Sequence, residues 1–185
     1  MIEDFVNDAM QRMDKSVEAT QEHFNSVRTG RASSALLDRV TIDYYGTPTP
    51  LKNLATINSP EPRMLTIQPF DPSAIKQIEK TIMESDLGLT PSSDGKLVRL
   101  PIPQLTEERR KELVKLVRQM AEEGKVAIRN VRRDAIKHLE DLVKKGEVGD
   151  DEERTAEARV QKLTDEHIAR IDDMLKRKEA DIMEV

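Results

Sequence analysis

The sequence predicts an α+β protein: a long antiparallel three-helix bundle interrupted by a small inserted α/β unit rich in β-strand. All nine prolines lie between Pro48 and Pro103. Because proline breaks helices, only the flanks can form continuous helix. Each flank carries apolar residues three and four apart, which is the spacing of a helix that buries one face. The middle segment instead carries β-branched runs and turn residues.

The segment before the first proline predicts one amphipathic helix over about residues 3–28. Its apolar and small residues recur three and four positions apart and therefore share one helical face. These positions are Ile2, Val6, Ala9, Met13, Val17, Thr20, Phe24 and Val27. Gly30 follows basic Arg28, where a left-handed residue commonly terminates a helix, so we expect the helix to stop there.

The proline-rich middle segment predicts short strands and one short helix. Partial alternation and β-branched residues predict strands at residues 40–44, 64–68 and 97–100, with a turn or edge segment at 46–50. Asp71-Pro72 is typical of a helix start, because aspartate caps and proline is tolerated at the first helical position. Isoleucines between residues 75 and 82 supply the apolar face of this helix, and Gly88 lies just past its end.

The segment after the last proline predicts two long helices. Thr106 can cap the first, which runs to about Lys145 and is about 60 Å long at about 1.5 Å per residue. Glycines at 146 and 149 end it, and the acidic residues from Asp150 favour the start of another helix, through about Ile182. The apolar seam, meaning the row of residues expected to be buried, differs for each helix. On the first it is Leu113, Val117, Met120, Gly124, Ala127, Val131, Ala135, Leu139 and Leu142, and on the second it is Ala156, Val160, Leu163, His167, Ile171, Met174 and Ile182.

These helices predict a discontinuous domain. Long helices are marginal in water unless their apolar faces pack together, so residues 1–30 and 105–185 are expected to form one bundle. Residues 31–104 then form the inserted β/α/β domain. Two thin crossings join the domains and predict a double hinge with relative domain motion. The hinge residues are Thr29, Gly30, Arg31, Pro103, Gln104 and Leu105.

Composition and motifs exclude several function classes. The chain has no cysteine, which excludes disulfides, thiolate nucleophiles and sulfur-based zinc sites. It shows no signal peptide and no stretch of about 18 apolar residues, so we expect a cytoplasmic location and no membrane insertion. Aromatic residues make up only 3%, which disfavours a broad ligand pocket. No phosphate-binding, dinucleotide-binding or nucleophile-elbow motif is present, so we expect neither a cofactor nor enzymatic activity.

A basic segment stands out in a chain of net charge −5. Residues 109–137 contain ten basic and four acidic residues. On a helical wheel five of the basic residues fall near one line opposite the apolar seam and are expected to point outward: Lys111, Arg118, Lys125, Arg129 and Arg132. The line spans about 30 Å, enough to follow several phosphates, and Arg133 adds a further guanidinium. Few aromatics are available to stack on bases, so the predicted contacts are to nucleic-acid backbone.

Other interpretations compete with nucleic-acid binding. The basic line is equally compatible with an ordinary solvated helix face. An adaptor that grips a protein partner through the acidic third helix, or an enzyme within the insert, are alternative classes. His138 and His167 could face each other, but core or surface histidines are the favoured interpretation. Tyr44 and Tyr45 are expected to point one inward and one outward on a strand.

Five segments resemble the signature segments of ribosome recycling factors, in order and at matching spacing along nearly the whole chain. They are residues 28–33 (RTGRAS), 44–51 (YYGTPTPL), 85–89 (SDLGL), 105–111 (LTEERRK) and 129–135 (RNVRRDA). The resemblance implies an L-shaped molecule of transfer-RNA size with the bundle as its long arm. It also implies a non-enzymatic factor that binds the post-termination ribosome and, with elongation factor G and GTP, separates the subunits.

The resemblance also implies partners and contact residues. The partners are the ribosome, chiefly large-subunit ribosomal RNA, and elongation factor G, whose GTPase activity serves the reaction; we expect the factor itself to be a monomer. The expected RNA contacts are basic residues of the matching segments and of the basic line: Arg109, Arg110, Lys111, Arg118, Lys125, Arg129, Arg132 and Arg133, with Arg28 and Arg31 near the hinge as second choices.

Overall fold

The computed structural model describes residues 1–184, which form two compact units. One unit comprises Met1–Val27 and Glu107–Glu184. The other comprises Arg28–Thr106. The chain therefore passes between the units at Val27–Arg28 and at Thr106–Glu107.

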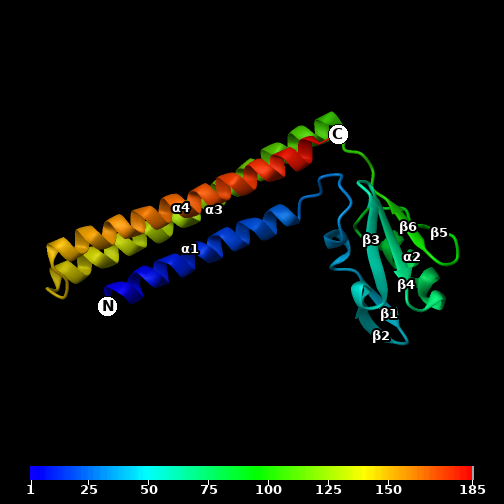
Figure 1. The fold of residues 1–185 in the computed structure, drawn as a ribbon, viewed down its shortest axis with the longest axis horizontal. Helices are drawn as coiled ribbons and strands as arrows, with labels where there is room; N and C mark the ends of the chain where they lie inside the picture. Colours follow the sequence, from blue (N-terminus) through cyan, green and yellow to red (C-terminus); the bar gives the residue numbers. More distant parts are fainter. Residues whose placement is uncertain (185) are drawn as a thin grey trace. The chain divides into compact units, whose positions relative to one another are not determined.

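The first unit is a three-helix bundle, which confirms the predicted fold class. Its helices are α1 (Ile2–Asn25), α3 (Glu107–Lys144) and α4 (Asp150–Met183). Each pair of helices is in contact, and α3 runs antiparallel to the other two (Figure 1). The apolar face expected for α1 is buried from Val6 to Phe24. Packing of three such faces is what stabilises helices of this length.

The buried face of α3 differs from the predicted seam. Ala121 and Ile128 are buried where the sequence predicted Met120 and Ala127, which are only partly buried. These replacements rotate the mean direction of the buried face by about 20° around the helix axis. The rotation carries part of the basic line towards α4, with consequences for the site.

Gly124 permits a close approach of α3 to both neighbouring helices. A Cβ atom at this position would collide with Oγ1 of Thr20 on α1 and would lie 3.0 Å from Cδ1 of Ile171 on α4. Thr20 is 2% exposed, and its hydroxyl donates a hydrogen bond to the carbonyl of Ser16 at 2.9 Å. Only glycine fits this crossing without displacing a buried side chain.

The end of α1 lies earlier than predicted. The helix ends at Asn25, and the Ser26 hydroxyl donates a hydrogen bond to the carbonyl of His23 at 2.6 Å. Gly30 has a φ of +75°, as expected of a left-handed residue, but it lies beyond the helix rather than at its cap. Local side-chain bonds of this kind compete with helix continuation.

The second unit combines a four-stranded antiparallel sheet, a two-stranded hairpin and one α-helix. The strands are β1 (Thr41–Tyr44), β2 (Thr47–Pro50), β3 (Ala55–Glu61), β4 (Met64–Pro69), β5 (Ser92–Ser93) and β6 (Val98–Pro101), and the helix is α2 (Ile75–Glu84). The sheet has the order β3-β4-β6-β5, and β1 pairs with β2 separately. Leu65 and Ile67 pair with Leu100 and Val98 across β4 and β6. Their side chains form one core with the isoleucines of α2.

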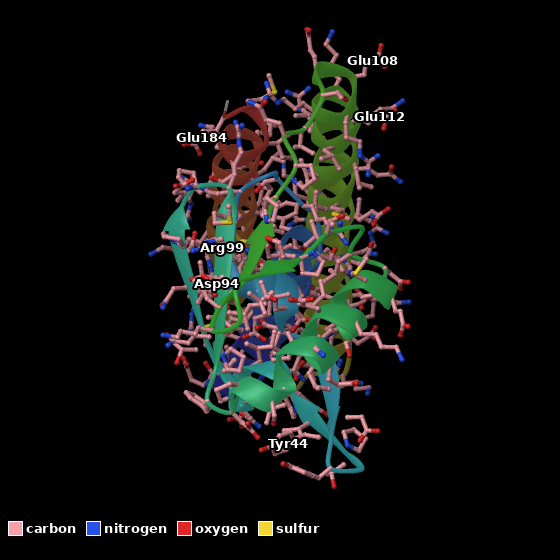
Figure 2. All side chains as sticks on the ribbon, turned by 90° about the vertical axis from the view of Figure 1, so that its right-hand side faces the viewer. Tyr44, Asp94, Arg99, Glu108, Glu112 and Glu184 are labelled. Carbon is pink, nitrogen blue, oxygen red and sulfur yellow. The ribbon has the colours of Figure 1, made fainter. Side chains whose placement is uncertain are left out.

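Two strands lie where the sequence predicted none, and a third takes one of two predicted forms. The 46–50 segment, predicted as a turn or edge segment, contains the strand β2, and residues 55–61 and 92–93 form β3 and β5. Asp94 closes the β5–β6 turn, because its Oδ1 accepts hydrogen bonds from the backbone N–H groups of Lys96 and Leu97. Its other oxygen pairs with Arg99 at 3.2 Å. Figure 2 labels Asp94 and Arg99 beside each other in this part of the sheet.

The start of α2 follows the predicted cap with one change. Asp71 Oδ1 accepts a hydrogen bond from the backbone N–H of Ser73 at 3.0 Å. Pro72–Ala74 first form a 3-10 turn, and α2 begins at Ile75. Asp71 Oδ2 also accepts a hydrogen bond from the Tyr44 hydroxyl at 3.0 Å, which fastens the hairpin to this helix start.

Candidate nucleic-acid interface

Three cations of the predicted line reach across to α4. Arg118 Nε donates to Glu179 Oε1 at 2.7 Å, Lys125 pairs with Asp172, and Arg132 Nε donates to Gln161 Oε1 at 2.6 Å. The Lys125 side chain is 18% exposed, so the expectation that it points outward is wrong. The rotated buried face explains this, since Lys125 lies beside the packed face and not opposite it.

The other two cations of the line pair within α3 and remain exposed. Lys111 Nζ lies 3.5 Å from Glu107 Oε1, and Arg129 Nη1 lies 3.1 Å from Glu122 Oε1. Their side chains are 73% and 47% exposed. Exposed pairs contribute at most about 1 kcal/mol. A phosphate could therefore replace the carboxylate partner at little cost.

The first turns of α3 hold further predicted contacts. Arg109 pairs with Glu112 at 2.9 Å and its side chain is 58% exposed. Arg110 is partly buried, and its Nε has no hydrogen-bond partner among residues 1–184. The hydrogen bond to the Glu179 carboxylate, which holds Arg118 on α4, raises the pKa of this guanidinium.

Several cations of α3 form no ion pair within the described part of the chain. They are Arg110, Lys115, Arg132, Arg133, Lys137 and Lys144. Arg132 and Arg133 are adjacent in the sequence; Arg132 is partly buried and Arg133 is exposed. Arg129 lies one turn before them. This part of α3 therefore has the highest density of guanidinium groups available to an outside anion, which is the arrangement that phosphate binding requires.

The second-choice arginines have different surroundings. Arg28 is exposed and its guanidinium donates to the backbone carbonyls of Asp86, at 3.2 Å, and of Leu87. It fastens the incoming chain to the segment after α2. Arg31 is exposed on the next turn of chain. Both belong to the second unit and not to the bundle.

The two predicted hinge crossings lie side by side within the second unit. A Cβ atom at Gly30 would lie 3.2 Å from Cγ of Leu105. The Gln104 carboxamide oxygen accepts from both terminal nitrogens of Arg63 at 2.7 Å. The backbone N–H of Ala32 donates to the carbonyl of Pro62 at 2.6 Å. These bonds tie both crossings to the turn between β3 and β4.

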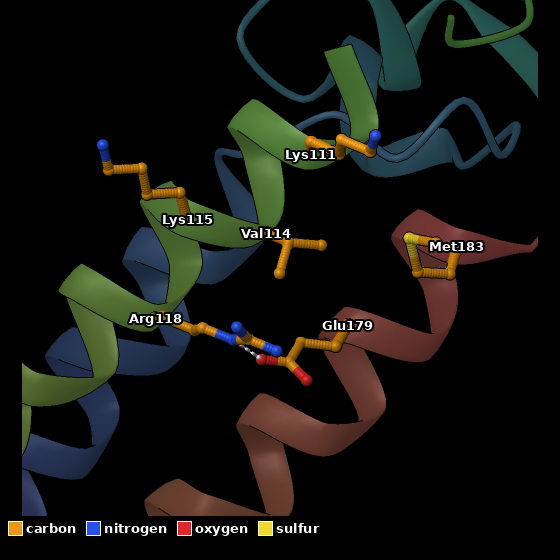
Figure 3. Close-up of a pocket in the computed structure, with 6 residues that line it drawn as sticks. All are labelled: Lys111, Val114, Lys115, Arg118, Glu179 and Met183. Atoms are coloured by element: carbon orange, nitrogen blue, oxygen red, sulfur yellow. Dashed lines mark hydrogen bonds and ion pairs between the residues drawn. The ribbon is translucent and has the colours of Figure 1, made fainter. Parts of the chain in front are cut away.

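A groove lies between the start of α3 and the end of α4 (Figure 3). It has a volume of about 440 Å³, with Lys111, Lys115 and Arg118 on the α3 side and Glu179 and Met183 on the α4 side. The Arg118–Glu179 pair crosses it, as the dashed line in Figure 3 shows. The groove therefore places three cations of α3 along one edge, and its lining residues do not include a converging set of catalytic groups.

The histidines and tyrosines serve structural contacts. His138 stacks on Phe5 with ring centroids 5.3 Å apart. His167 is buried, with Nε2 2.7 Å from Asp14 Oδ1, so the two histidines do not face each other. Tyr45 is 83% exposed and Tyr44 is partly buried, but their rings meet edge to face with centroids 4.6 Å apart. Tyr45 has a φ of +50° in the turn after β1, so the predicted opposite orientation along a strand is wrong.

Searches of the described residues for other kinds of site give negative results. Residues 1–184 contain no group of three or more histidine, aspartate or glutamate side chains arranged to hold a metal ion. In the same range no helix is long and apolar enough to cross a membrane.

Sequence reasoning missed the residues of α4 that hold the basic line. Glu179, Asp172 and Gln161 were not among the predicted site residues, although they orient Arg118, Lys125 and Arg132. A signal was present in the spacing. The three cations recur every seven residues, and α4 carries acids at 165, 172 and 179 with the same interval. Such matching repeats are typical of facing antiparallel helices.

The fold and the surface define a class: a helical-bundle protein with an inserted sheet domain and a cationic helix face. The family model "Ribosome recycling factor" matches residues 20–183. The chain belongs to the ribosome recycling factor family.

Full-length relatives agree with this assignment. The ribosome-recycling factor of Rubrobacter xylanophilus is 56% identical over 180 residues, covering 97% of both chains. That of Geobacillus kaustophilus is 55% identical over 185 residues, covering 100% of both. That of Thermosynechococcus vestitus is 58% identical over 178 residues, covering 96% of this chain and 98% of its own.

Solved structures show the same fold. A solution structure of a ribosome recycling factor aligns with a TM-score of 0.81 at 41% identity, covering 100% of this chain and 98% of that one. A second describes the T. thermophilus ribosome recycling factor and E. coli elongation factor G bound to the E. coli post-termination complex. It aligns with a TM-score of 0.68 at 46% identity and covers 100% of both chains.

Proposed function

We propose that this protein binds the post-termination ribosome and, with elongation factor G and GTP, promotes its separation into subunits for a new round of translation. It acts as a binding factor in the cytoplasm and as a monomer, and the GTPase activity belongs to its partner. The proposal is supported chiefly by the full-length likeness to a factor solved on a post-termination complex together with elongation factor G.

The chemistry of α3 supports contact with ribosomal RNA backbone. The contacts we propose are the ten basic residues Arg109, Arg110, Lys111, Arg118, Lys125, Arg129, Arg132, Arg133, Arg28 and Arg31. Within this set we give Arg129, Arg132 and Arg133 the leading role, because they lie within two turns of one helix and guanidinium forks match phosphate oxygens. Arg118, Lys125 and Arg28 already bind groups of the protein itself, which makes their contribution smaller.

We propose that the bundle and the inserted unit act as two rigid bodies. The bundle comprises residues 1–30 and 105–185, and the inserted unit comprises residues 31–104. Motion occurs about the two crossings between them, at 29–31 and 103–105. The bonds that fasten Ala32, Ile102 and Gln104 to the β3–β4 turn hold the crossings on the side of the inserted unit, which favours rotation at their bundle ends, next to residues 27–28 and 106–107. A bundle of long packed helices is stiff and transmits displacement well. When the partner moves the inserted unit, the resulting force can therefore reach the contact between the bundle and the ribosome.

Ribosome binding tests the RNA-contact proposal. The double variant R132Q/R133Q removes two adjacent cations of α3, and K176Q/R177Q removes two adjacent cations of α4 with the same change in net charge. Each lost phosphate contact is expected to weaken co-sedimentation with 70S ribosomes on the order of tenfold. R132Q/R133Q should therefore bind much more weakly than wild type, and K176Q/R177Q nearly as wild type. Equal loss in both variants would show a general charge effect and would refute the assigned contacts.

A crosslink tests the two-body proposal. The chain has no cysteine, so one cysteine introduced on each unit can be joined by a bifunctional reagent and no other thiol competes. The locked protein should bind ribosomes and fail to split them with elongation factor G and GTP. The same cysteine variant before crosslinking is the control. Full splitting activity in the locked form would exclude motion about the crossings as the mechanism.

A further inference from the structure

The contacts between α3 and α4 form a regular series of cross-helix pairs. Arg118 pairs with Glu179, and Lys125 pairs with Asp172. From the first pair to the second, the α3 residue advances by seven and the α4 residue retreats by seven. One more step of seven places Arg132 opposite Asp165. The spacing alone thus predicts a third ion pair.

The third position departs from this series. Arg132 Nε donates instead to the neutral side-chain oxygen of Gln161 at 2.6 Å. The amide nitrogen of Gln161 donates to Asp165 Oδ1 at 2.9 Å. A glutamine thus stands between the guanidinium and the carboxylate that the series would have supplied. Only one orientation of the amide satisfies both neighbours, so Gln161 is itself held in place.

The first and third positions make a matched comparison within one molecule. In both, the Nε of an α3 arginine donates to an oxygen on α4. The acceptor is a carboxylate for Arg118 and a carboxamide for Arg132. The first arrangement neutralises the cation, whereas the second leaves its full charge. It also leaves the four N–H groups of the two terminal nitrogens, since a guanidinium has about five N–H donors in all.

We propose that Gln161 is a positioning residue for ribosomal RNA binding: it orients the Arg132 guanidinium through Nε while leaving its charge and its terminal nitrogens for a phosphate. The inference rests on the proposed function. A freely rotating arginine loses side-chain entropy when it binds, and a pre-oriented one loses less. A carboxylate in the same place would orient the group equally well but would compete with the phosphate.

A purely structural role for Gln161 makes the opposite prediction. If Gln161 only joins α4 to α3, then glutamate at this position keeps or strengthens the link, and ribosome binding is unchanged. If Gln161 serves the charge of Arg132, then Gln161→Glu turns the third position into a copy of the Arg118–Glu179 pair and lowers affinity. The sign of the effect of one substitution therefore separates the two roles.

The test measures binding of the full-length protein to purified large ribosomal subunits at several salt concentrations. The variants are Q161E, R132Q, the double variant R132Q/Q161E, and A169E. Ala169 is an exposed residue of α4, so A169E adds the same negative charge away from the Arg132 pair. Melting temperature is followed for each variant to confirm folding.

We expect Q161E to weaken binding on the order of tenfold and to reduce the salt slope by about one, as loss of one phosphate contact does. A169E should bind nearly as wild type. R132Q/Q161E should bind no more weakly than R132Q, because Gln161 acts only through Arg132. Wild-type affinity in Q161E, equal losses in Q161E and A169E, or additive losses in the double variant would each overturn the inference. Absence of salt-sensitive binding by the wild type would instead refute the proposed function.

Discussion

Replacing Gly124 with alanine tests the close helix crossing on which the bundle geometry depends. In an ordinary helix interior this change stabilises by about 1 kcal/mol. Here the added methyl would overlap the Thr20 hydroxyl and crowd Ile171, and overpacking of this kind costs about 1–3 kcal/mol. Displacing the Thr20 hydroxyl from its bond to Ser16 costs about 1 kcal/mol more. We therefore expect a net destabilisation of about 1–3 kcal/mol.

The assay is thermal and urea unfolding followed by helical circular dichroism. G124A should melt several degrees below wild type, since about 1 kcal/mol corresponds to about 2–4 °C in a chain of this size. The variant T20A/G124A should recover much of the loss, because alanine at position 20 removes the overlapping oxygen, and T20A alone supplies the reference. A G124A protein as stable as wild type, or more stable, would refute the close packing of α1 on α3.

Two further predictions concern the Asp14 carboxylate, which is bonded to the buried His167, and the crossings. Hydrogen bonds, that from His167 above all, hold the pKa of the Asp14 carboxyl below its usual value. The stabilisation is therefore complete above about pH 3.9, the pKa of an unfolded aspartate, and is lost as pH falls towards the folded pKa. D14N should lose stability at neutral pH by about 1 kcal/mol, because solvent screens bonds to a side chain that is 40% exposed, and its acid-unfolding profile should be flatter than that of wild type. G30A should destabilise the second unit by more than G95A. Both substitutions place a Cβ atom on a left-handed backbone, but only at position 30 does that atom approach Leu105. Equal losses in G30A and G95A, measured by hydrogen exchange in the sheet, would show that the Leu105 contact is unimportant.

The fold followed from features of the sequence that report directly on backbone chemistry. Confinement of every proline to residues 48–103 marks where continuous helix is impossible. The spacing of apolar residues in α1 identified its buried face from Val6 to Phe24. Both features depend on local sterics and periodicity, which act before any tertiary contact exists.

The small strands were harder to predict because their pairing is set by neighbours. Strands β2 and β3 contain Pro48, Pro50 and Pro60, which argue against strand on propensity alone. Prolines are nevertheless tolerated on edge strands, and both β2 and β3 lie at edges. The two-residue strand β5 has no periodicity to detect.

The candidate site was predicted in its residues but not in its arrangement. The identities of the α3 cations were visible as a local charge excess. Their direction depended on which small residues are buried, and Ala121 is as compatible with a surface as with a core. The role of Gln161 required knowledge of how α4 faces α3, which a single helical wheel does not contain.

The salt dependence of ribosome binding tests the central claim most directly. If basic residues of α3 grip RNA backbone through about four to six phosphates, the logarithm of the association constant should fall with the logarithm of salt concentration with a slope between about −3 and −5. R132Q/R133Q should reduce that slope by about two. A salt-independent affinity, or a slope unchanged by loss of these two guanidinium groups, would contradict the account.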